Sequence, residues 1–298
     1  MINRASLAQA AALIRAGKLV AFPTETVYGL GANALDAAAV ERIFQAKNRP
    51  RTSPLIVHVD SVEMARRFAA DWPVTAEILA RRYWPGPLTL VLPKTHEIPD
   101  IVTAGLPTVG LRMPAHRLAL ELIREAGVPI AAPSANRFTE LSPTTAEHVS
   151  QSLADFVLDG GPAQVGIEST VLSLAGPATL LRPGVIPLPE IEEFIGPVRL
   201  PEAPAEGPHA SPGMHARHYH PKTPLYLLAG ADAAPPGKGA WLRLGHEMPA
   251  TPREYGAALY DTLHRLDREG WDWIAVERPS DTPEWAGILD RLTRAAIR

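Results

Sequence analysis

The sequence predicts an α/β protein with a mixed sheet, and three observations support this. Short apolar runs rich in strand-forming residues alternate with longer segments whose apolar residues recur at helical spacing. Several steps between strands look like hairpins, so the sheet is not expected to be purely parallel. Hydroxyl and basic side chains gather at strand ends, where α/β proteins commonly carry their sites. The 298 residues suit one large domain and a smaller one.

The composition is that of an ordinary globular enzyme, with 46% hydrophobic and 20% charged residues. A net charge of −3 argues against a surface broadly coated for nucleic acid, so any anion site must come from a local cluster of basic side chains. The absence of cysteine excludes disulfides, thiolate catalysis and Cys-ligated metal sites. No secretory segment and no run of about 18 apolar residues is found, so we expect a cytoplasmic protein without membrane association.

The chain begins with a helix expected over residues 6–16, which Gly17 ends. A buried strand follows at 19–22 and stops at Pro23, because proline has no N–H to donate to a ladder. A second helix is expected over 36–46, with Asp36 as its N-cap.

The loop between this strand and this helix, Pro23–Asn33, carries hydroxyls and the glycines Gly29 and Gly31. Glycine can adopt backbone angles closed to other residues and lets a ligand approach the main chain. The residues from Gly29 to Ala34 fit a G-x-G-x-x-A dinucleotide pattern, but six residues separate the strand from the first glycine, which disfavours a nicotinamide site. A substrate loop and a plain tight connection remain as alternatives.

The remaining elements of the large domain follow from the same criteria of periodicity and turn residues. Helices are expected over residues 61–70, 74–83, 115–126 and 144–152. Strands are expected over residues 55–59, 88–92, 108–112, 130–132, 156–158 and 167–174, with 180–184 closing the unit.

The second half of the chain predicts a linker and a small α/β domain. Residues 189–223 are rich in proline and weakly periodic, but they contain the distinctive island SPGMHARHYHP at 211–221. We therefore expect domains at 1–188 and 224–298 with a linker at 189–223. In the small domain, strands are expected at 224–229, 239–244 and 272–276, and helices at 252–268 and 283–297.

Four cations, Lys47, Arg49, Arg112 and Arg182, lie beside hydroxyl-rich turns. This combination suits phosphate and carboxylate, because the guanidinium fork binds either one bidentately while hydroxyls and N–H groups satisfy the remaining acceptors. The full set of candidate site residues is Thr26, Lys47, Arg49, Ser53, His58, Thr108, Arg112, Ser134, Asn136, Ser142, Ser169 and Arg182.

Each candidate has a structural alternative. A single arginine at a strand end is more often a surface or capping group, and Ser134 with Asn136 could simply close an Asx turn. His58 in an apolar strand is by default a core histidine. The sequence has no nucleophile elbow, and the Gly230–Lys238 segment has the wrong spacing for a P-loop. Because His215, His218 and His220 have no carboxylate nearby, we predict no metal site.

Taken together, the motifs resemble those of the Sua5/YciO/YrdC family. The resemblance covers residues 5–188 and rests on PTETVYGLG at 23–31, KNR at 47–49, SPLIVH at 53–58, WPGPLTLVL at 84–92, VGLRMP at 109–114, PSAN at 133–136, SPT at 142–144 and ESTVL at 168–172. The island and the tail resemble the two-domain Sua5 branch. The implied fold is a YrdC-like twisted mixed sheet flanked by helices, with a concave cationic cleft and a small Rossmann-like C-terminal domain.

The activity implied by the resemblance is that of an L-threonylcarbamoyladenylate synthase. Such an enzyme joins L-threonine, bicarbonate and ATP, with Mg²⁺, into threonylcarbamoyl-AMP and pyrophosphate. Partner transferase proteins then pass the threonylcarbamoyl group to adenosine 37 of tRNA, giving t6A; direct binding of tRNA is left open. Two other hypotheses remain: a non-catalytic RNA-binding module, and an enzyme of related fold that uses carbamoyl phosphate. The second is weakened because the chain lacks zinc-finger cysteines.

The resemblance also implies roles for individual residues. The L-threonine pocket matches Thr26, His58, Arg112, Ala132 and Ser169. The ATP positions match Arg49, Ser53, Thr108, Ser134, Ser142, Arg182 and Tyr219, and the catalytic signature matches Lys47, Arg49, Ser134 and Asn136.

Two stretches depart from the family pattern. Phe138-Thr139 replaces a usual Ser-Gly, and His215-Ala216 replaces a common Lys-Tyr. We further hypothesise that the linker covers the cleft as a lid, with Tyr219 and Arg217 as its contacts.

Overall fold

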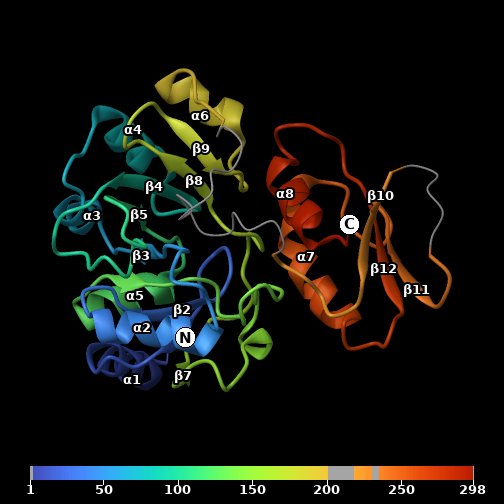
Figure 1. Ribbon diagram of the computed structural model, residues 1–298, viewed down its shortest axis with the longest axis horizontal. Coiled ribbons are helices and arrows are strands. Elements are labelled where there is room, and N and C mark those ends of the chain that lie inside the picture. The colour runs from blue at the N-terminus through green and yellow to red at the C-terminus, as the bar shows by residue number, and fades with distance from the viewer. Residues whose placement is uncertain (1–2, 201–217, 230–234, 298) are drawn as a thin grey trace.

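Two α/β domains lie side by side in the computed structural model, which describes residues 3–200, 218–229 and 235–297. The helices α7 (Pro252–Leu266) and α8 (Ala286–Ala295) lie between the small sheet and the large domain (Figure 1). The mixed α/β class predicted from the sequence is confirmed.

The large domain contains a nine-stranded sheet in the order β7-β1-β2-β6-β3-β5-β4-β8-β9. β1 pairs antiparallel with β2, whereas β3 pairs parallel with β5, so the sheet is mixed. The strands are β1 (Val20–Phe22), β2 (Gly29–Asn33), β3 (Ile56–His58), β4 (Leu88–Pro93), β5 (Thr108–Arg112), β6 (Ile130–Ala131), β7 (Phe156–Val157), β8 (Thr170–Ser173) and β9 (Thr179–Arg182).

Helices cover both faces of this sheet. Apolar residues of α1 and α5 form one buried cluster with β1 and β6, and residues of α2, α3 and α4 form a second cluster on the other face. Asp36 caps α2 as expected, since its side chain accepts from the N–H groups of Ala38 and Ala39. The helices are α1 (Arg4–Arg15), α2 (Ala37–Lys47), α3 (Val62–Phe68), α4 (Val74–Tyr83), α5 (Arg117–Ala126) and α6 (Leu188–Ile195).

The glycines after Pro23 were expected in a loop, and this was wrong, because Gly29 and Gly31 belong to strand β2. Neither glycine is among the described residues with positive φ. A Cβ atom on Gly31 would lie 2.8 Å from side-chain atoms of Phe22 and Ile130. Glycine is therefore needed here because neighbouring strands bring bulky side chains over the backbone.

Three further elements differ from the sequence predictions. The helix expected at 144–152 is only a 3₁₀ turn, Ala146–His148, with His148 folded back onto Thr144. The strand expected at 167–174 is shortened to β8. Helix α6 was not predicted; it begins at the expected domain boundary and packs against α4.

The small domain has a parallel three-stranded sheet in the order β10-β12-β11, and its elements match the predicted ones closely. Its strands are β10 (Leu225–Leu228), β11 (Gly239–Leu242) and β12 (Trp273–Glu277). Val27, Leu141 and Ile167 of the large domain join its apolar core, so the two domains pack directly on each other.

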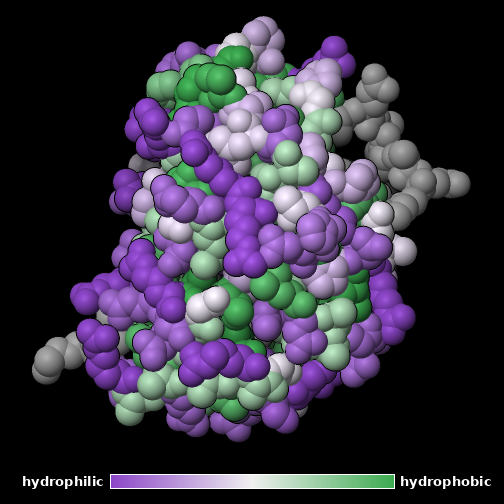
Figure 2. Space-filling view, turned by 90° about the vertical axis from the view of Figure 1, so that its left-hand side faces the viewer, coloured by the Kyte–Doolittle hydropathy of each residue, from purple (hydrophilic) through white to green (hydrophobic). Residues whose placement is uncertain are grey.

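The face of the large domain that points away from the small one is predominantly hydrophilic, with hydrophobic side chains in small scattered areas (Figure 2). Among the described residues, no helix combines the length and apolarity needed to span a bilayer.

Candidate active site

Nine of the predicted site residues line one pocket beside the domain contact. They come from the loop after β1, from strands β3, β5 and β9, and from the segments that follow α2 and β6 and precede β8 and β10. The nine are Thr26, Arg49, His58, Arg112, Ala132, Ser134, Ser169, Arg182 and Tyr219. Residues from Thr26 to Tyr219, spread over 194 positions of sequence, therefore converge on one pocket.

Arg112, at the end of β5, is fixed from three sides. Its Nη2 donates to Thr26 Oγ1 at 2.9 Å and lies 2.7 Å from a carboxylate oxygen of Glu25, while its Nε donates to the Gly86 carbonyl. The Arg112 and Glu25 side chains are 4% and 6% exposed. The pocket thus contains a buried cation whose orientation is set before any ligand binds.

His58 pairs with Arg112 across the β3–β5 ladder. Burial, followed by the positive charge of Arg112, lowers the pKa of His58 to about 3. The imidazole is therefore neutral at physiological pH and can accept or donate one hydrogen bond without adding charge.

Arg49 and Arg182 supply two further cations. Arg49 donates to the hydroxyl of Ser53 and to the carbonyl of Pro54, whereas Arg182 donates to the carbonyl and hydroxyl of Ser169. Burial lowers the pKa of Arg49 to about 10, so this guanidinium stays protonated at neutral pH. Burial also lowers the pKa of Arg182. These groups are arranged to neutralise a polyanion.

Lys47 and Asn136 do not line the pocket, but their side chains bind main-chain carbonyls of the loop beside it. The Lys47 ammonium donates to the main-chain carbonyls of Ser134 and Asn136, and burial holds its pKa well below the usual value. The Asn136 amide donates to the carbonyls of Arg137 and Glu140 and faces a separate groove between the domains. Both residues therefore shape the loop at 133–136.

Ser53, Thr108 and Ser142 also lie outside the pocket wall. Ser53 accepts from Arg49, Ser142 donates to Glu168 at 2.5 Å, and Thr108 lines a small neighbouring pocket that shares Ile56 with this one.

The sequence analysis missed two buried carboxylates. Glu25 pairs with Arg112, and Glu168 lines the pocket itself. Both lie inside motifs that the sequence analysis singled out, PTETVYGLG and ESTVL. They were overlooked because the search was for cations and hydroxyls; a buried cation in an apolar strand is itself a signal that a carboxylate partner is near.

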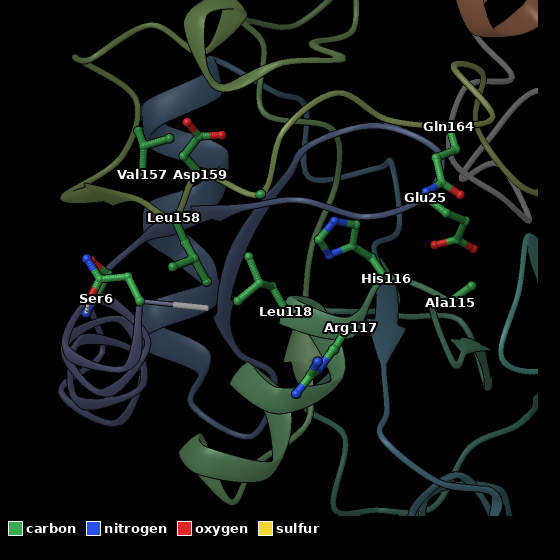
Figure 3. A pocket seen from close by; sticks show the side chains of 12 residues that line it. Ser6, Glu25, Ala115, His116, Arg117, Leu118, Val157, Leu158, Asp159 and Gln164 are labelled. Atoms are coloured by element: carbon green, nitrogen blue, oxygen red, sulfur yellow. Dashed lines mark hydrogen bonds between the residues drawn. The ribbon is translucent and has the colours of Figure 1, made fainter. Parts of the chain in front are cut away.

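The remaining space in the pocket is about 50 Å³, with Tyr219 buried in its wall at 1% exposure. Since a water needs about 10–15 Å³ of cavity space of this kind, the pocket holds only a few waters. A larger cavity of about 830 Å³ lies elsewhere on the large domain (Figure 3). Its wall includes Glu25, His116 and Asp159, with Arg117 as its one cation among the described residues, so it is less suited to a polyanion.

No group of three or more His, Cys, Asp or Glu side chains that could hold a metal ion occurs in the described part of the chain. His218 makes ring contacts with Phe138 and Tyr219. His215 and Arg217, which the sequence analysis also considered, lie outside the described residues.

Comparisons with known proteins identify the family to which both domains belong. A Sua5/YciO/YrdC family model described as "Telomere recombination" matches residues 12–184, and a model of the threonylcarbamoyl-AMP synthase C-terminal domain matches residues 186–297.

Relatives match along both domains. The threonylcarbamoyl-AMP synthase of Pyrococcus abyssi is 43% identical over 96% of this chain and 93% of its own length. That of Bacillus subtilis is 42% identical over 99% and 94%. The crystal structure of P. abyssi Sua5 complexed with L-threonine has a TM-score of 0.90 at 41% identity, covering 97% of this chain and 94% of that one. The chain therefore belongs to the Sua5/YciO/YrdC family and has the two-domain architecture of its Sua5 branch.

Proposed function

We propose that this chain is an L-threonylcarbamoyladenylate synthase, which converts L-threonine, bicarbonate and MgATP into threonylcarbamoyl-AMP and pyrophosphate. The observation that supports this best is the convergence of Arg49, Arg112 and Arg182 with a neutral His58 on one pocket. The named relatives, which match over both domains, are threonylcarbamoyl-AMP synthases.

In this proposal, L-threonine lies against Arg112, whose guanidinium pairs with the substrate carboxylate. Thr26 and His58 lie beside this guanidinium and offer hydrogen bonds to the substrate's amine and hydroxyl. The backbone at Ala132 and the hydroxyl of Ser169 complete the threonine pocket.

The nucleotide then occupies the part of the pocket around Arg49 and Arg182. These two cations, with Ser134 and Tyr219, contact ATP. Ser53, Thr108 and Ser142, which the resemblance places at the ATP site, support or adjoin this wall. Lys47 and Asn136 act by holding the loop that carries Ser134.

The chemistry needs no covalent enzyme intermediate. The threonine amine attacks CO₂ or bicarbonate to give a carbamate, and from the ammonium form with bicarbonate this step releases one water and one proton. A carbamate oxygen then attacks the α-phosphorus of ATP, and the bond from that phosphorus to the pyrophosphate oxygen breaks. Positioning three small polar substrates and neutralising their charge is work that preorganised buried cations can do.

Among the described residues of the pocket wall, Glu168 is the one carboxylate, and it is already engaged by protein groups. A resident Mg²⁺ site therefore does not fit this wall. We propose that Mg²⁺ arrives with the triphosphate and keeps water as most of its ligands.

ATP is far larger than the 50 Å³ left in the pocket, so we propose that the linker acts as a lid that opens to admit ATP, with Tyr219 as one of its contacts to the nucleotide. Deletion of residues 205–223 is expected to reduce ATP turnover. Full activity of that deletion variant would argue against the lid.

The test of function is to mix the purified chain with ATP, Mg²⁺, bicarbonate and L-threonine. We expect pyrophosphate release that requires threonine, together with threonylcarbamoyl-AMP detected by mass spectrometry. Binding of duplex RNA without pyrophosphate release would support the RNA-binding alternative, and turnover of carbamoyl phosphate would support the third hypothesis. We further propose that cytoplasmic transferase proteins take up the product for t6A formation.

A further inference from the structure

Glu168 is an unusual component of a nucleotide pocket. It precedes β8, is 8% exposed and lines the same wall as Arg49 and Arg182. A bare carboxylate at this position would repel the phosphates of ATP and would itself be costly to bury.

Two residues of the small domain engage this carboxylate. Arg291 of α8 donates from Nε to Glu168 Oε2 at 2.8 Å and from Nη2 to the Glu168 carbonyl at 3.2 Å. The hydroxyl of Tyr260 in α7 lies 3.2 Å from Oε2. Ser142 of the large domain donates to the other oxygen, Oε1. Both carboxylate oxygens are thus occupied by protein groups.

The charge balance of the site depends on the same contacts. Burial raises the pKa of Glu168, but the positive charges of Arg291 and then Arg182 outweigh it and bring the value down to about 2. Arg291 is itself 1% exposed, and its guanidinium carbon lies 5.4 Å from the ring centre of Tyr219. One side chain of α8 therefore contacts two residues of the pocket wall.

Two contacts between the domains keep α8 close enough for Arg291 to reach the pocket wall. Arg291 Nη1 donates to the Pro183 carbonyl at 2.8 Å, next to Arg182. Gly287, one turn earlier in α8, faces Gly184, and a Cβ atom on Gly287 would lie 2.5 Å from the Gly184 carbonyl oxygen.

We infer that the small domain forms part of the nucleotide site: Arg291 and Tyr260 are positioning residues that neutralise Glu168 and turn it away from the phosphates of ATP. This inference rests on the proposed function. The C-terminal domain would then contribute to ATP binding by supplying the cation and the hydroxyl that engage Glu168.

The test uses the full-length chain and the Arg291→Met variant, which keeps bulk and removes the charge. Because the variant removes the cation that compensates Glu168 beside the nucleotide, we expect KM for ATP to rise about tenfold or more, with KM for threonine changed less than about threefold. Adding Glu168→Gln removes the uncompensated charge, so the double variant should recover most of the lost ATP affinity. Arg265→Met, on an exposed face of α7, is the matched control and should behave as wild type.

A second pair of variants covers the case in which Arg291→Met fails to fold. Tyr260→Phe and Arg291→Lys keep most of the packing, and each should raise KM for ATP by about two- to fivefold while leaving KM for threonine near wild type. The inference would be overturned if KM for ATP were unchanged in these variants. It would also be overturned if KM for ATP and KM for threonine rose equally and Glu168→Gln did not reverse the rise. A wild-type chain without threonine-dependent pyrophosphate release would instead reject the proposed function.

Discussion

The carboxylate of Glu25 lies 2.7 Å from the guanidinium of Arg112, and together they form a buried ion pair at the part of the pocket that we propose for L-threonine. The pair is held by contacts from two separate segments, since Arg112 also reaches Thr26, next to Glu25, and the carbonyl of Gly86. A substrate carboxylate would meet a guanidinium whose geometry is already set, which lowers the entropic cost of binding.

The first prediction concerns this pair. Arg112→Met leaves the Glu25 carboxylate buried without its partner, so we expect the free energy of unfolding to fall by about 3–5 kcal/mol and threonine-dependent turnover to fall at least about 100-fold. The double variant Glu25→Gln/Arg112→Met should regain most of the stability but not the activity. Urea unfolding and pyrophosphate release measure the two effects, and recovery of threonine affinity in the double variant would contradict this assignment.

A second prediction concerns pH. His264 of α7 stacks on His148 at 3.9 Å, close to Asp267, Asp261 and Arg268. Burial, with the neighbouring His148, lowers the pKa of His264 to about 4, below its value in the unfolded chain. The unfolded state therefore binds more protons between those values, and the stability contributed by the neutral imidazole is lost as pH falls from about 6.5 to 4.

We accordingly expect His264→Asn to lose less stability than wild type when the pH is lowered from about 7 to 4.5, as followed by urea unfolding. The exposed His246→Asn serves as the control and should follow the wild-type pH profile. Identical pH profiles for His264→Asn and wild type would show that this imidazole is not the group responsible.

A third prediction addresses Lys47. Lys47→Met fills the same space but leaves the buried carbonyls of Ser134 and Asn136 without a donor. We expect stability to fall by about 1–3 kcal/mol and kcat/KM to fall by about 100-fold, because the loop carrying Ser134 shifts. Thermal unfolding and steady-state kinetics check both effects, with the exposed Lys18→Met as the control. Normal kcat/KM in the Lys47 variant would mean that the loop keeps its shape without the ammonium.

A fourth prediction tests the contact between the domains. Gly287→Ala places a methyl group against the Gly184 carbonyl, so α8 must move outwards. We expect a lower Tm and a higher KM for ATP, since Arg291 lies one turn further along the same helix. Gly176→Ala is the control, because a Cβ there meets no atom within 4 Å. A crystal structure of the Gly287 variant with α8 unmoved would rule out this explanation.

The sequence was sufficient for elements whose signals are local. The apolar runs and turn residues located most strands to within a few residues, and the Asp36 cap was confirmed. Strand β2 was missed because Gly29 and Gly31 suggested a loop, although their absent side chains make room for Phe22 and Ile130. Helix α6 was missed because its prolines suggested a linker, yet Pro189 lies in the first turn, where no N–H partner is lost.

The site residues also differ in whether local sequence or the fold reveals them. Local motifs identified nine residues that the fold brings to one pocket. The pair of Glu168 and Arg291, however, is separated by 123 positions and joins two domains. Nothing in the spacing near either residue reveals the other, because their pairing arises from how α8 packs on the large domain.

The reach of Arg291 across the domain boundary has a consequence for protein engineering. If the chain were cut in its proline-rich stretch, the N-terminal fragment would keep Glu168 in its pocket without the Arg291 charge that compensates it. The C-terminal fragment would expose the Arg291 guanidinium on its surface. Mixing the two halves should therefore restore turnover in proportion to their reassociation, and added salt should weaken that complementation.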